Sequence, residues 1–219
     1  TPSLMLLWAV GGFLSSISVG TQAMTARRFG EGDREAAGQV LPNAALAALV
    51  GGLVASAVGW FLVPTAFRAL SDNANVVALG TSYTRWRFFG IASMAATAAY
   101  KSFYDGVGRT HLHLVAALAM NVVNALLCWL LIFGNLGLPA MGVSGAGVAA
   151  CASSWIGFFV MVALSLRGAD RQAFRFYRPG VLSATIMRRL VGLSVPGGVA
   201  TAAVMAGFLM FTKVVNSID

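Results

Sequence analysis

The chain has 219 residues, of which 58% are hydrophobic and 10% are charged, and its formal net charge is +8. Soluble domains carry about 25% charged residues, so this composition excludes a soluble enzyme and makes lipid the solvent of the chain. The basic residues gather at the ends of long apolar stretches, as membrane topology requires, and not on an aromatic face that would bind nucleic acid. The two cysteines, Cys128 and Cys151, lie inside apolar runs and do not form a disulfide framework.

Six stretches are long and apolar enough to cross a membrane as helices, because a bilayer core about 30 Å thick needs about 20 apolar residues. The third is the least apolar, since Lys101 and Asp105 stand near its end, four residues apart, where they are placed to pair. We therefore predict an all-α, polytopic transmembrane helix bundle. The predicted spans are 4–26, 40–65, 88–107, 114–134, 143–166 and 190–212.

The charges between the spans predict their orientation. The connections after the first, third and fifth spans carry eleven basic residues, against three on the opposite side, namely Arg68, Arg85 and Arg87. The positive-inside rule places the first group in the cytoplasm, so we expect a multi-pass protein of the bacterial inner membrane. The first span then runs inward, which is natural with one helix ahead of it. Without an initiator Met or a signal peptide, the sequence reads as a piece of a longer protein.

The segment 167–189 is rich in arginine and contains Phe174, Phe176 and Tyr177 beside Arg175 and Arg178. Basic residues mixed with aromatics suit a helix that lies at the headgroup level. The length also suits a linker between two bundles. An ordinary cytoplasmic loop is an equally good interpretation.

Four stretches resemble the MATE (multidrug and toxic compound extrusion) transporters. Residues 21–33, TQAMTARRFGEGD, resemble the stretch after the second MATE helix, and 103–110, FYDGVGRT, the end of the fourth. Residues 132–147, IFGNLGLPAMGVSGAG, resemble the junction of the fifth and sixth helices, and 193–196, LSVP, the start of the seventh. Their order places the chain at helices two to seven of twelve.

The resemblance implies two six-helix lobes with a substrate path between and within them. Residues 1–166 would form most of the N-terminal lobe, 167–189 a basic cytoplasmic linker, and 190–219 the first helix of the C-terminal lobe. The implied activity is secondary efflux of lipophilic or cationic compounds in exchange for Na⁺ or H⁺ by alternating access. We expect a monomer in the lipid bilayer that is not an enzyme, needs no cofactor other than the coupling ion, and binds no nucleic acid.

Polar residues inside apolar spans are the candidates for a substrate or ion cavity. Asn121 and Asn124 lie about one turn apart on one predicted helix, where both amides need partners. They predict either a hydrogen-bonded clamp between helices or a cavity wall. Trp155 suits packing or stacking on a lipophilic cation. The candidate cavity residues are Thr97, Asn121, Asn124, Cys128, Ser153, Trp155 and Thr201.

No coupling site is identified. Cys128 stands four residues after Asn124, where many proton-coupled relatives carry a carboxylate, and 204–206 contain no acid where sodium-coupled relatives often carry a glutamate. Asp105 is best read as a boundary residue paired with Lys101, and the pair of His111 and His113 is too small for a metal site.

Two other functions stay open. A flippase for lipid-linked oligosaccharides would line its cavity with Arg or Lys to hold pyrophosphate. The middle thirds of the six predicted spans contain no basic residue, which disfavours the flippase. The other alternative is a membrane protein that transports nothing.

Overall fold

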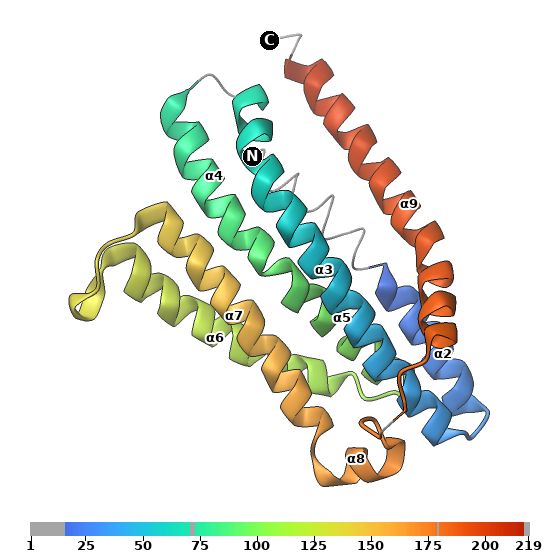
Figure 1. Cartoon of the computed structure of the whole chain (residues 1–219). Helices are drawn as coiled ribbons and strands as arrows, with labels where there is room; N and C mark the ends of the chain where they lie inside the picture. Colours follow the sequence, from blue (N-terminus) through green and yellow to red (C-terminus); the bar gives the residue numbers. More distant parts are fainter. Residues whose placement is uncertain (1–15, 71–72, 179, 217–219) are drawn as a thin grey trace.

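The computed structural model describes residues 16–70, 73–178 and 180–216. Within these ranges the chain is built of α-helices and one short 3-10 turn, with no strand. Figure 1 shows the long helices side by side in a bundle, with a short helix crossing one end. The elements are α2 (Ile17–Gly30), α3 (Arg34–Leu70), α4 (Ala74–Phe89), α5 (Ile91–Gly106), α6 (His111–Phe133), η1 (Asn135–Gly137), α7 (Gly142–Ser165), α8 (Gly168–Phe174) and α9 (Ala184–Asn216).

The helices form an all-α transmembrane bundle, as predicted. Three described helices are long and apolar enough to cross a membrane: Arg34–Arg68, His111–Phe133 and Gly142–Ser165. Their outward faces expose large apolar side chains, such as Phe61 (76% exposed) and Phe133 (69% exposed), which suits contact with lipid. Part of the first predicted span, 4–15, lies outside the described residues.

The third predicted span is longer than expected and begins earlier. Helices α4 and α5 have 16 residues each, and Gly90 between them keeps helical backbone angles (φ −79°, ψ −12°). The two helices therefore form one nearly continuous rod with Gly90 at its midpoint, about 50 Å long at 1.5 Å per residue. Arg85 and Arg87 lie inside this rod, so the prediction that they belong to a connection between spans is wrong.

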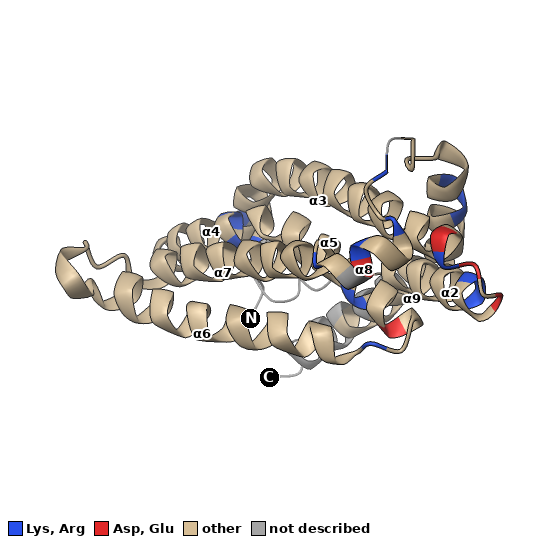
Figure 2. Ribbon diagram, turned by 90° about the horizontal axis from the view of Figure 1, so that it is seen from below, with Lys and Arg blue, Asp and Glu red and all other residues tan. Residues whose placement is uncertain are grey.

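Neighbouring helices supply partners for two of the polar residues that made α4 look like a connection. Arg85 donates from Nε to the Trp60 carbonyl oxygen (3.1 Å), and its guanidinium lies 5.0 Å from the centre of the Trp60 ring. Ser82 and Ser144 share a hydrogen bond of 2.8 Å between α4 and α7. A helix whose polar side chains find partners on its neighbours need not be apolar all round. Figure 2 shows charged residues concentrated around α2, α8 and the start of α9, with a further basic segment on α4.

The aromatic residues of the 167–189 segment face inward. Phe174 and Phe176 are buried, and their rings lie 5.3 and 5.2 Å from that of Phe103 on α5. Tyr177 shares hydrogen bonds of 2.7 Å with the hydroxyls of Tyr100 and Ser165. Phe174 and Phe176 therefore seal the end of the bundle, and the position of the segment at the headgroup level stays a prediction.

The last helix begins inside the predicted linker. Helix α9 starts at Ala184, so Arg188 and Arg189 lie in its first two turns and not in a loop. It packs mainly against α2, as Figure 1 also shows. The contact is close at Gly20, where an added Cβ would lie 2.8 Å from the Leu190 carbonyl oxygen.

Candidate functional site

A cavity of about 540 Å³ lies between the rod formed by α4 and α5 and the paired helices α6 and α7. Binding sites for drug-sized molecules have volumes of about 300–1,000 Å³. The walls combine small residues, two methionines and several polar or basic groups. The lining residues are Tyr83, Arg87, Met94, Thr97, Ala98, Lys101, His113, Met120, Asn121, Asn124, Ala150, Ser153 and Ser154.

The two asparagines of α6 have different partners. Asn124 donates from Nδ2 to Ser153 Oγ on α7 (3.1 Å), so it links the two helices. Asn121 donates only to the Ala117 carbonyl oxygen of its own helix (2.9 Å), and its side chain is exposed. Asn124 thus acts as a clamp between helices, whereas Asn121 presents its amide oxygen to the cavity wall without bracing another helix.

Basic groups give the cavity its charge. The Arg87 side chain makes no hydrogen bond or ion pair with any described residue, and its Nε is buried without a partner. The Nδ1 of His113 is likewise buried and unpaired. Lys101 pairs with Asp105 at 2.5 Å, which confirms the predicted (i, i+4) contact. No carboxylate lines the described part of this cavity, so Arg87 leaves its walls positively charged.

The structure gathers four of the seven candidate residues around this cavity: Thr97, Asn121, Asn124 and Ser153. Cys128 is not among the lining residues, and its Sγ lies 3.9 Å from the Asn124 amide oxygen.

Trp155 and Thr201 are not among the lining residues. The Trp155 ring packs at 5.9 Å from Phe158 and at 6.5 Å from Phe89, so it belongs to an aromatic cluster between helices. Thr201 lies on α9, which contacts mainly α2 and α3, and its hydroxyl donates to the Gly197 carbonyl oxygen (2.9 Å). Both predictions followed from depth in a span, which does not determine the direction in which a side chain points.

Sequence reasoning missed Arg87 and Tyr83, because it placed the start of the third span too late, and it did not single out Met94 inside that span. The available signal was helical spacing: Tyr83, Arg87 and Met94 are four and seven residues apart, which puts them on one face of a continuous helix. His113, which the sequence offered only as half of a pair too small for a metal site, lines the cavity with Lys101.

The family model named MatE matches residues 3–130, which is more than half of the chain. The chain belongs to the MatE family. The probable multidrug resistance protein NorM of Agrobacterium fabrum is 30% identical to this MatE chain over 177 residues, which cover 76% of the chain and 37% of that protein. The multidrug resistance protein PmpM of Pseudomonas aeruginosa is 26% identical over 203 residues, 91% of the chain and 42% of that protein. The MatE chain thus spans about two fifths of these relatives.

Solved structures support the same fold. An outward-facing multidrug resistance MATE family transporter of the MOP superfamily aligns with a TM-score of 0.82 at 19% identity, covering 97% of this MatE chain and 46% of that one. A MOP superfamily transporter from Pyrococcus furiosus, described as having a binding pocket of reversed polarity, aligns with a TM-score of 0.81 at 19% identity, covering 97% of this chain and 47% of that one. At this identity the likeness establishes the fold alone.

Proposed function

We propose that this chain forms most of one lobe of a secondary multidrug efflux transporter that exports lipophilic compounds by alternating access. The observation that carries the proposal is the cavity between α4, α5, α6 and α7, which is large enough for a drug and lined by several polar groups. Relatives described as multidrug resistance proteins support the same activity. We place the protein in the bacterial inner membrane, as a monomer that is not an enzyme.

The proposal includes coupling to Na⁺ or H⁺. Export against a gradient needs an energy source, and in membranes a carboxylate is the usual group that takes up the ion. Asp105 is paired with Lys101, which lines the cavity, and that ion pair already occupies the carboxylate. The choice between the two ions therefore belongs to an experiment with gradients.

The test is dye efflux from cells that express the gene carrying this sequence, with ethidium as the cationic dye. The sodium and proton gradients are collapsed in turn. Efflux that stops with one gradient would support antiport and identify the ion. Absence of efflux under either gradient, with the protein confirmed in the membrane, would overturn the proposal.

One observation favours a second candidate, a flippase for lipid-linked oligosaccharides. The argument against it rested on the absence of basic residues from the middle of the spans, and Arg87 lies three residues from the midpoint of the α4–α5 rod. A guanidinium with free donors in a cavity suits a pyrophosphate group. The Lys101 ammonium, on the same wall, adds to the positive potential there.

Substitution of Arg87 separates the two candidates, and Arg85 provides the matched control. Both arginines lie on α4, but Arg85 is bonded to Trp60 away from the cavity. A flippase would translocate a fluorescent lipid-linked pyrophosphate in vesicles, and Arg87→Gln would abolish this activity while Arg85→Gln would retain it. A drug transporter would not translocate that lipid. Its Arg87→Gln variant would still export ethidium.

A further inference from the structure

The geometry points to a second site, at the junction of α2 and α9, that binds the phosphate group of an anionic phospholipid. A cavity of about 630 Å³ lies there, outside the candidate substrate cavity. Helix α2 contributes Met24, Arg27, Arg28 and Glu31, and α9 contributes Arg189 and Leu193. The inference concerns binding alone and does not depend on the transport activity proposed above.

Close packing on one side of the cavity fixes its two walls. At Gly20 an added Cβ would lie 2.8 Å from the Leu190 carbonyl oxygen and 2.9 Å from Ser194 Oγ, so the helices touch there. Toward the charged end of α2, longer side chains replace glycine. The site is therefore held between two helices that already contact each other.

The charges in the cavity leave donors without acceptors. Arg27 pairs with Glu31 at 2.9 Å, which neutralises both. Arg28 uses one nitrogen, Nη1, to donate to the Ala36 carbonyl oxygen (2.6 Å). Arg189 makes no hydrogen bond or ion pair with the described residues. After the one ion pair, two positive charges remain in the cavity, with no acid left to balance them.

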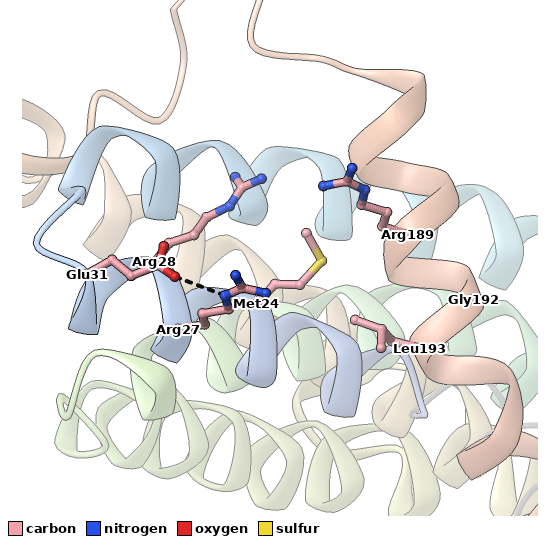
Figure 3. Close-up of a pocket in the computed structure, with 7 residues that line it drawn as sticks. All are labelled: Met24, Arg27, Arg28, Glu31, Arg189, Gly192 and Leu193. Carbon is pink, nitrogen blue, oxygen red and sulfur yellow. Dashed lines mark hydrogen bonds and ion pairs between the residues drawn. The ribbon is translucent and has the colours of Figure 1, made fainter.

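Figure 3 shows how these two charges face each other. The guanidinium groups of Arg28 and Arg189 come from different helices and point toward one another across the opening, with Met24 beside them. Facing like charges repel, and an anion between them turns that repulsion into two attractions. Planar guanidinium groups match phosphate oxygens in bidentate geometry, which makes phosphate the best-suited anion.

Apolar surface next to the arginines selects a phospholipid over free phosphate. Leu193 is 50% exposed at the cavity, and Val19 on α2 is 55% exposed nearby along the helix. An acyl chain would cover such surface. The arginines stand at the charged end of the bundle, where basic pockets between helices meet headgroups.

The test is native mass spectrometry of the protein in detergent with phosphatidylglycerol, against phosphatidylcholine of the same acyl chains. We expect phosphatidylglycerol to bind preferentially, and Arg189→Gln and Arg28→Gln each to weaken it about tenfold through loss of a charge-assisted contact. Arg188→Gln is the matched control, because Arg188 is an exposed arginine one position earlier on α9 that does not line the cavity. It should bind as the unaltered protein does.

Each other outcome overturns the assignment. Equal binding of the two lipids would remove the anionic preference. If Arg188→Gln weakened phosphatidylglycerol binding as much as Arg189→Gln does, the net charge of the protein would explain the effect, and no specific site would be needed. Displacement of phosphatidylglycerol by millimolar inorganic phosphate would reassign the site to free phosphate. The fold of each variant is checked by circular dichroism. If Arg189→Gln does not fold, Arg28→Gln, on the other helix, still tests the site by its loss of phosphatidylglycerol binding.

Discussion

The buried amide of Asn43 joins α3 to the segment that leads into α9, and its removal tests how that segment is held. Asn43 Nδ2 donates to the Val181 carbonyl oxygen (2.9 Å), and its Oδ1 accepts from the Ser183 backbone N–H (2.8 Å). The side chain is fully buried, and Nδ2 also donates to the Gln39 carbonyl oxygen within α3. Asn43→Ala therefore breaks two contacts between segments that are far apart in sequence.

The size of the effect follows from those two hydrogen bonds. Each contributes about 1 kcal/mol net, so local opening of 181–183 should become about 2 kcal/mol easier, or about 30-fold more frequent. Hydrogen exchange of the Ser183 amide reports that opening directly, because Asn43 provides its acceptor. We expect exchange of this segment to accelerate by about that factor, with little change in the amides of α6.

Asn121→Ala is the matched control for this experiment. Asn121 is also an amide on a membrane-crossing helix, but it donates only to Ala117 in its own helix. Its substitution should leave exchange at 181–183 unchanged. Equal rates at 181–183 in Asn43→Ala and the unaltered protein would refute the reasoning, since the segment would then be held by other contacts.

Two further substitutions test packing in the bundle. Gly52→Leu should destabilise the protein by about 1–3 kcal/mol, because even a Cβ at Gly52 would lie 2.4 Å from Ala92 Cα, and the thermal unfolding temperature in detergent should fall. Tyr177→Phe removes a hydroxyl hydrogen-bonded to Tyr100 and Ser165 at 2.7 Å each, and we expect a loss of about 1–2 kcal/mol in the same assay.

Gly168 provides the control for the glycine, since an added Cβ there meets no atom within 4 Å. Gly168→Leu should keep the original unfolding temperature, and a similar fall in both glycine variants would contradict the packing argument. For Tyr177→Phe, an unfolding temperature equal to that of the unaltered protein would show that the shared hydroxyl contributes nothing to stability.

The sequence predicts the spans best where helices face lipid. Bilayer thickness forces long apolar runs, so the predicted 114–134 and 143–166 differ from α6 and α7 by a few residues at most. The same rule fails for α4, where Arg85 bonds to Trp60 on α3 and Ser82 to Ser144 on α7. Hydropathy measures how favourably a helix is transferred into lipid. It takes no account of hydrogen-bond partners that neighbouring helices supply to polar side chains.

The cavity was predictable only in part, for a related reason. Polar type and depth identified Thr97, Asn121, Asn124 and Ser153, because a polar group in a span needs some partner. They could not exclude Thr201, because a span that is apolar on every side carries no pattern that shows which face turns inward.

The contrast between Arg85 and Arg87 bears on what the cavity does. Both lie near the middle of the α4–α5 rod, where an unpaired charge is costly. Arg85 recovers part of that cost from the Trp60 carbonyl and ring, whereas Arg87 has no partner among the described residues. A guanidinium retained in a polar cavity without a partner requires either water or a bound anion.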